Sequence, residues 1–209
     1  DLCAGAGGAT RWLADVSTKV YAIEKHPGLV AMHKAIQCGK WLPPMSVSEE
    51  DYARLRREGL TEDPLTAFAE FGCSFGGKSW GGYARTVAGN AAARNYAMNA
   101  RNALLRDTRT NVEFLCDDAL TCALPAGVRV VYCDPPYEKT TGYDAVSDDA
   151  PSVGKWWRRL STLAEQGLTC YLSEYAEQPP FEIKACLVWS APTREGLRPQ
   201  GARTERLWK

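Results

Sequence analysis

Residues 1–14 read DLCAGAGGATRWLA, in which a short polar-to-apolar stretch leads into six small residues and then into a helical pattern. Residues 4–9 include three glycines, which allow a tight turn and close approach of another backbone or a ligand. Residues 10–14 are typical of the first turns of a helix. A strand end, a glycine turn and a helix start in this order predict the opening of an α/β domain. Because the chain begins at Asp1 in what reads as the end of a strand, we expect a preceding segment.

The pattern of strand, acid and helix then repeats along the chain. Residues 20–23 read as a strand that ends at Glu24, and residues 27–36 have helical spacing. We expect a helix with a capped entry at Ser48 and further helices over 90–107 and 156–166. Further strands are expected at 112–116, 128–133, 168–172, 183–189 and 204–208. This alternation predicts an α/β fold with one mostly parallel sheet, helices on both faces and a terminal hairpin.

Composition favours a compact globular chain without a strong field of its own. The 209 residues include 25 Lys and Arg and 25 Asp and Glu, so the formal net charge is +0, and any polyanion must meet a local patch. No run is long and apolar enough for a membrane span, and no signal peptide pattern is present, which favours a cytoplasmic monomer. Eight scattered cysteines without a C-x-x-C pair, and only two histidines, predict reduced, mostly buried thiols and no metal site.

Ligands of open α/β sheets bind beyond the carboxyl ends of the strands. Four such ends, which we expect to converge on one crevice, carry Gly5 to Gly8, Glu24, Asp118 and Asp134. Glu24 is placed to accept hydrogen bonds from both hydroxyls of a ribose. Thr10 stands where the dinucleotide fingerprint has its third glycine, so the pattern favours S-adenosylmethionine, which has a ribose but no phosphates. The alternative interpretation is a simple tight turn and a solvated acid.

The tetrapeptide Asp134-Pro135-Pro136-Tyr137 adds a second kind of chemistry. Two prolines after a strand fix an extended backbone, which holds Asp134 and one carbonyl as paired acceptors beside the ring of Tyr137. Two acceptors and an aromatic wall suit a planar exocyclic amine whose lone pair faces an incoming methyl group. A base inside a duplex reaches such a pocket only when it is flipped out of the stack.

These segments together resemble the Dam-like, alpha-type adenine-N6 DNA methyltransferases. The resemblance runs in family order along nearly the whole chain and rests on residues 1–8, Glu24, residues 71–85, Asp118 and residues 131–137, 173–175 and 205–207. Some RNA methyltransferases also carry a D-P-P-Y tetrapeptide, whereas the ordered set is specific to the Dam-like family. The family usually has Phe at the position of Cys3 and Asp at the position of Glu24.

The resemblance implies a Rossmann-like, S-adenosylmethionine-dependent methyltransferase sheet formed by residues 1–40 and 110–209. Residues 41–109 would form a helical target-recognition insert that binds DNA. The implied cofactor residues are Cys3, Ala4, Gly5 and Gly7 at the methionine end, Glu24 at the ribose, Asp118 at the cofactor's adenine, and Asp134. The implied catalytic residues, which hold the target adenine, are Asp134, Pro135, Pro136 and Tyr137.

The activity implied is site-specific transfer of a methyl group from S-adenosylmethionine to N6 of a flipped adenine in double-stranded DNA, without a metal. The enzyme would be bacterial or phage-encoded, either alone or as the partner of a restriction endonuclease. Two alternatives stay open. One is a methyltransferase acting on a base amine of ribosomal RNA, and the other is a catalytically inactive, nucleic-acid-binding relative.

Predicted DNA contacts come from a glycine-rich loop and a basic segment. Residues 85–109 carry a local net charge of +4, which suits phosphates despite the neutral whole. The predicted DNA-binding residues are Lys78, Trp80, Tyr83, Arg85, Arg94 and Arg101. The alternative interpretation is that Trp80 and Tyr83 cover the core and that Arg94 and Arg101 form an ordinary solvated helix face.

Overall fold

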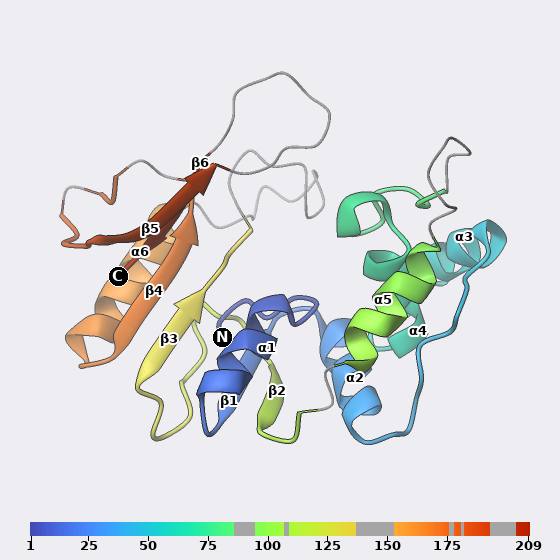
Figure 1. Cartoon of the computed structure of the whole chain (residues 1–209), viewed down its shortest axis with the longest axis horizontal. Helices are drawn as coiled ribbons and strands as arrows, with labels where there is room; N and C mark the ends of the chain where they lie inside the picture. Colours follow the sequence, from blue (N-terminus) through green and yellow to red (C-terminus); the bar gives the residue numbers. More distant parts are fainter. Residues whose placement is uncertain (86–94, 107–108, 137–152, 176–177, 181, 193–203) are drawn as a thin grey trace. The chain divides into compact units, whose positions relative to one another are not determined.

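The computed structural model describes residues 1–85, 95–106, 109–136, 153–175, 178–180, 182–192 and 204–209. The chain forms two compact units, both drawn in Figure 1. Unit 1 holds Asp1–Cys3 and the described residues from Asp118 to the end of the chain, and unit 2 holds the described residues from Ala4 to Asp117.

Unit 2 contains a parallel pair of strands and most of the helices. Its elements in chain order are α1 (Gly8–Val16), β1 (Val20–Glu24), α2 (Pro27–Gln37), α3 (Glu49–Glu58), α4 (Pro64–Ala67), a π-helical turn (Phe68–Gly72), a 3₁₀ turn (Phe75–Gly77), α5 (Tyr96–Leu105) and β2 (Val112–Cys116). The predicted strands at 20–23 and 112–116 and the predicted helix at 27–36 are confirmed within one residue at each end.

The two strands of unit 2 pair in parallel, with Val20 opposite Val112 and Glu24 opposite Cys116. Apolar side chains on one side of this pair pack against α1 and α2, so that Ala22 and Phe114 are buried. A parallel pair with helices against it is the expected product of strand, helix and strand in sequence. The pairing places the ends of β1 and β2 at the same edge.

A second, larger core lies among the helices of unit 2. It joins α2 to the described part of the predicted recognition insert, residues 41–85 and 95–106. Its buried side chains are Leu29, Met32, Ile36, Val47, Tyr52, Leu55, Ala67, Phe68, Ala69, Phe71, Cys73 and Ala97. The helices of residues 41–109 therefore share a core with α2 and are stabilised by the burial of its apolar face.

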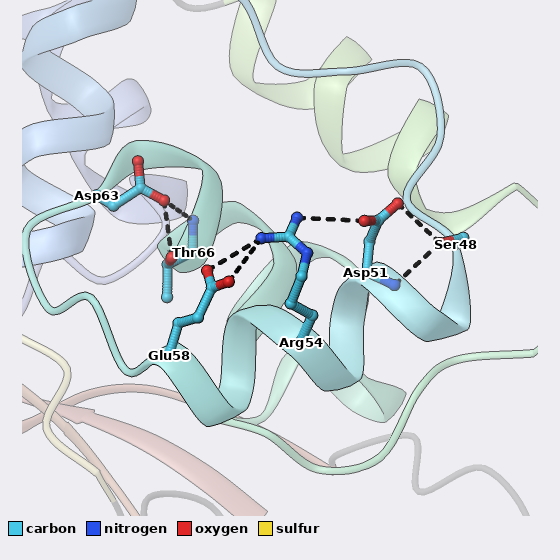
Figure 2. Close-up of polar contacts among 6 residues, drawn as sticks. All are labelled: Ser48, Asp51, Arg54, Glu58, Asp63 and Thr66. Carbon is cyan, nitrogen blue, oxygen red and sulfur yellow. Dashed lines mark hydrogen bonds and ion pairs between the residues drawn. The ribbon is translucent and has the colours of Figure 1, made fainter.

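Polar side chains fix the ends of the short helices in this region, as Figure 2 shows. The Ser48 hydroxyl accepts the N–H of Asp51 at 3.0 Å, which confirms the predicted capped entry of α3. Arg54 lies between Asp51 and Glu58 and donates to both carboxylates. Asp63 caps α4 by accepting the N–H and the hydroxyl of Thr66, each at 2.7 Å.

Unit 1 is a four-stranded mixed sheet with one long helix against it. Its elements are β3 (Val130–Cys133), α6 (Val153–Glu165), β4 (Thr169–Glu174), β5 (Leu187–Pro192) and β6 (Thr204–Trp208), with the strand order β3-β4-β6-β5. β3 and β4 are parallel, whereas β6 runs antiparallel to both β4 and β5. Buried side chains of α6 contact this sheet, and the ring of Trp157 lies 5.9 Å from that of Trp208.

The mixed α/β class and the antiparallel terminal pair are confirmed, but the described strands form two sheets where the sequence predicts one. The predicted strand end at residues 1–3 is wrong as a strand, because these residues make a single ladder-like bond, from Leu2 N–H to the Tyr132 carbonyl at 2.9 Å. The strand predicted at 183–189 lies at Leu187–Pro192 instead, since Ile183 N–H bonds to the Pro180 carbonyl in a turn.

The cysteine prediction holds only in part. None of the eight cysteines, all of which lie in the described ranges, forms a disulfide, but only Cys73, Cys122 and Cys133 are buried, and Cys38, Cys116 and Cys186 are exposed. The scattered positions of the cysteines do not indicate which of them lie in the core and which lie at strand ends or in loops. Within the described ranges, no helix has the length and apolar character needed to cross a membrane.

Candidate functional site

Residues 4–8, here called the glycine turn, lead directly into α1. Gly7 N–H donates to the Ala4 carbonyl at 2.8 Å and closes the turn. Gly5 and Gly7 have φ angles of +50° and +83°, in the left-handed region that residues with a Cβ adopt only at a cost. A Cβ on Gly7 would also lie 3.2 Å from Cε1 of His33. The conformation of the turn therefore depends on both glycines, and Gly7 has a second constraint.

Glu24 is the last residue of β1 and is hydrogen-bonded to the glycine turn. Its Oε2 accepts Gly5 N–H at 2.7 Å, and its Oε1 accepts His26 N–H at 2.8 Å. The side chain is partly exposed, and each carboxylate oxygen keeps a further lone pair for another donor. The structure thus places the predicted ribose acid directly on the predicted cofactor turn.

His33 supports the glycine turn from α2. Its Nε2 lies 3.2 Å from the Gly5 carbonyl, and its ring stacks on Phe114 with centroids 4.3 Å apart. Among the described residues, no cluster of three or more metal-ligating side chains occurs. His33 packs the turn against β2 and so takes part in the geometry of the site.

His26 is a residue whose role at the site the sequence did not reveal. Its backbone N–H holds Glu24, and its Nε2 lies 3.2 Å from Oε2 of Glu70. Burial lowers the pKa of His26, but the hydrogen bond and charge of Glu70, with the charge of Glu24, outweigh burial and raise the pKa above 6.5. The only local signal was its position before Pro27, where a helix cap is expected.

Asp134 follows β3 in unit 1, where Pro135 is fully buried and Pro136 is exposed. Neither proline has an N–H, so the next two residues offer the Asp134 carboxylate no backbone donor. Burial and then the negative charges of Asp134 and Glu205 raise the pKa of Tyr132 to about 12. The neutral phenol of Tyr132 therefore borders a locally acidic end of the strand. Tyr137 lies outside the described residues.

Cys3 and Asp118 are the other predicted cofactor residues of unit 1. Cys3 Sγ lies 3.9 Å from Sγ of Cys133, the residue before Asp134. Asp118 Oδ1 accepts Leu120 N–H at 2.9 Å, which makes a local turn just beyond β2. The remaining cofactor residues, Ala4, Gly5, Gly7 and Glu24, belong to unit 2.

The segments 173–175 and 205–207, which also carry the family resemblance, are brought together on paired strands. Ser173 lies opposite Leu207 in the antiparallel ladder of β4 and β6. The Ser173 hydroxyl donates to Oε1 of Glu205 at 2.9 Å, and Arg206 donates to the Tyr175 carbonyl at 2.8 Å. Polar contacts of both segments thus hold the middle of the unit 1 sheet beside β3.

The rings of Trp80 and Tyr83 pack against the core of unit 2. Tyr52 contacts both of them, with ring centroids 5.1 Å from Trp80 and 5.6 Å from Tyr83. The Tyr83 hydroxyl donates to the Val47 carbonyl at 2.7 Å. This packing agrees with the alternative interpretation of the two rings as core cover, and their contact with DNA stays a prediction.

Two of the four predicted basic contacts, Arg85 and Arg101, already have partners within unit 2. Arg85 pairs with the Glu49 carboxylate through Nε at 2.9 Å and through Nη2, and Arg101 donates to the Pro43 carbonyl. Lys78 is partly exposed in the same loop, and Arg94 lies outside the described residues. An anion that approaches Arg85 must displace a carboxylate.

Phe75 is an exposed aromatic residue of the glycine-rich loop that the predicted set omitted. Its side chain is 69% exposed, whereas Trp80 is partly buried. The loop is braced on both sides of it, because Phe75 N–H bonds to the Gly82 carbonyl and Ala84 N–H to the Cys73 carbonyl, each at 2.9 Å. Single exposed apolar side chains are common on protein surfaces, so Phe75 alone does not mark a binding site.

No family model matches the chain, and no relative was found among curated proteins.

Proposed function

We propose that this protein is a site-specific, S-adenosylmethionine-dependent methyltransferase that acts on N6 of adenine in double-stranded DNA, as its Dam-like sequence motifs imply. The observation that carries the proposal is the pair of backbone N–H bonds that hold Glu24 at the end of β1, one of them from the glycine turn. A carboxylate fixed in this way is a ready acceptor for a ribose diol.

The chemistry of the donor set supports this cofactor over a dinucleotide. The glycine turn presents no cation for a pyrophosphate, and Thr10, at the position of the fingerprint's third glycine, is buried in α1. S-Adenosylmethionine has a ribose but no phosphate, so a neutral turn and a carboxylate fit its charge. When bound, it supplies an electrophilic methyl group on a sulfonium.

Asp134 supports the choice of an amine as the acceptor of the methyl group. Asp134 follows β3, and the two prolines after it have no N–H to donate to its carboxylate. Asp134 and a carbonyl of the proline segment would each accept one hydrogen of the adenine amine. The lone pair of N6 then points away from both acceptors, which orients it for in-line attack and supplies rate through positioning.

The Rossmann-like fold is part of the same proposal. It is supported by the parallel pairs β1–β2 and β3–β4, each with an acid at or just after a strand end.

The proposal is tested by transfer of labelled methyl groups from S-adenosylmethionine to unmethylated duplex DNA, with structured RNA assayed in parallel. The product nucleoside is identified by mass spectrometry. N6-Methyladenine in DNA is the expected product, and sequencing then gives the recognised site. Label in RNA would move the substrate class to the ribosomal RNA alternative. Cofactor and duplex binding without transfer would instead favour an inactive relative.

A further inference from the structure

Glu70, in the π-helical turn of unit 2, is a buried carboxylate with two specific partners. Its side chain is only 6% exposed. Oε1 accepts the Ser79 hydroxyl at 2.6 Å, and Oε2 lies 3.2 Å from Nε2 of His26. Burial of a carboxylate costs free energy unless hydrogen-bond donors compensate it, so Glu70, Ser79 and His26 form one interdependent hydrogen-bond network.

His26 transmits this arrangement to Glu24 because its ring and its backbone are both fixed. Leu29 N–H donates to Nδ1 at 3.2 Å, so in the neutral ring the hydrogen is on Nε2 and points to Glu70. The ring also meets the edge of Phe71, with centroids 5.2 Å apart. A ring held from both nitrogens orients the His26 N–H that donates to Glu24 at 2.8 Å.

Ser79 connects the same carboxylate to an exposed turn of the glycine-rich loop. Gly81 N–H bonds to the Lys78 carbonyl at 3.1 Å and closes this turn over residues 78–81. Its third residue, Trp80, has a φ of +42°, the one non-glycine residue with positive φ in the described chain. Such a conformation persists only where surrounding contacts enforce it, and the Ser79 bond is one of them.

We propose that Glu70 is a positioning residue that links turn 78–81 to the Glu24 carboxylate, with His26 and Ser79 as its connectors. The conformation of the turn then sets how tightly Glu24 holds a ribose diol. This cofactor role rests on the proposed function, whereas the physical link between turn and carboxylate does not. Since the turn carries Lys78 and Trp80, two of the predicted DNA contacts, duplex and cofactor affinities are coupled, and the coupling acts equally in both directions.

The test uses the full chain and four substitutions. Ser79→Ala removes one hydroxyl, Glu70→Leu removes the carboxylate, and Glu70→Gln keeps an acceptor for His26 and offers a donor to Ser79. Ser46→Ala is the matched control, because Ser46 is an exposed serine in the same unit. The two readouts are hydrogen exchange of the Gly5 and His26 amides without ligand, and affinity for S-adenosylmethionine by calorimetry.

We expect affinity to fall roughly tenfold in Glu70→Leu and about threefold in Ser79→Ala, with faster exchange of both amides. Glu70→Gln should recover most of the loss, and Ser46→Ala should match the wild type. Exchange of the Phe114 amide in β2 should stay unchanged, which separates a local effect from general loosening of the unit. If Glu70→Leu does not fold, Ser79→Ala still carries the test.

Unchanged exchange at Gly5 and His26 in Ser79→Ala would overturn the link, even in a protein that binds S-adenosylmethionine well. Faster exchange at these amides together with Phe114 would overturn it too, since it would show general destabilisation. Faster local exchange in a chain whose wild type binds no S-adenosylmethionine would support the link and overturn its cofactor role together with the proposed function.

Discussion

Strands β1 and β3 each lead to an acid, but the two carboxylates are held in different ways. Glu24 accepts N–H bonds from Gly5 and His26, one on each oxygen. Asp134 is followed by two prolines, which have no N–H to give. At Asp118, where no proline follows, the carboxylate accepts the N–H of Leu120 two residues later. A proline at that position would prevent such a bond.

The difference separates two kinds of acceptor. A carboxylate tied to the backbone, such as Glu24, keeps its orientation in the absence of a ligand and suits recognition of a ground state. A carboxylate followed by two prolines, such as Asp134, receives no hydrogen bond from the N–H groups of the next two residues. We therefore expect substitutions at the two strand ends to affect different steps.

The largest effect is expected at β3. Asp134→Ala should lower kcat for methyl transfer about 1000-fold, because an amine without its acceptor is neither oriented nor stabilised. Duplex affinity, measured by fluorescence anisotropy on the same preparation, should stay within roughly threefold, since the carboxylate adds no attraction for phosphate. A parallel loss of duplex binding would contradict the role assigned to Asp134.

At β1 the loss should appear in binding instead. Glu24→Ala should weaken S-adenosylmethionine affinity about 30-fold, as expected for hydrogen bonds to a charged group, with kcat at saturation nearly unchanged. Glu24→Asp serves as the matched variant and should lose less, because it keeps the carboxylate. If kcat fell as far in Glu24→Ala as in Asp134→Ala, the distinction between the two strand ends would be wrong.

The glycine turn that holds Glu24 can be tested through stability alone. Gly7→Ala should lower the free energy of unfolding by about 2 kcal/mol, since it combines a positive φ with a contact on the His33 ring. Gly5→Ala, with positive φ but open space around its Cβ, should cost about 1 kcal/mol. Urea unfolding measures both values. Equal losses of unfolding free energy in the two variants would show that the His33 ring moves to accommodate the new Cβ.

The two prolines after Asp134 predict a second, smaller effect at β3. Pro136→Ala supplies an N–H two residues after Asp134, which allows the local turn seen at Asp118, and should lower kcat about fivefold. Pro125→Ala is the control, because it adds an N–H in the turn before β3 without a carboxylate two residues earlier. Full activity of Pro136→Ala would show that Asp134 is held by other means.

The smallest effect is the pH dependence of the His26 contact. Because the folded-state pKa of His26 is raised, its contribution to stability is fully present below about pH 6.5 and is lost as pH rises through the raised value. The free energy of unfolding should change by less than about 1 kcal/mol over this range, since the protonated ring loses its hydrogen bond from Leu29 N–H. Thermal unfolding between pH 6 and 8 measures it, and His26→Asn should remove the slope.

Local patterns in the sequence predicted much of this arrangement. The alternation at 112–116, the cap at Ser48 and the acid after residues 20–23 each depend on neighbours in the chain, and the structure has them where expected. The long-range features were not predicted. The described strands form two sheets, which no local pattern indicates, and the contact of His26 with Glu70 joins segments that share no local pattern.

The glycine-rich loop shows the same limit in side chains. Its glycines and aromatics predicted a shaped loop, but not which rings turn inward. Packing on Tyr52 takes Trp80 and Tyr83 into the core, and Phe75 remains outside. Burial of each ring depends on α3 and on the braced backbone, neither of which spacing alone reveals.

The ion pairs of unit 2 have a consequence for duplex affinity. Arg54, Arg85 and Arg109 each have a carboxylate partner within the unit. If a duplex phosphate takes one of these guanidinium groups, the DNA releases a counterion, but the freed carboxylate attracts a cation from solution. Loss of the ion pair then offsets part of the gain from the phosphate contact, so the contact should add less to duplex affinity than an unpaired guanidinium would.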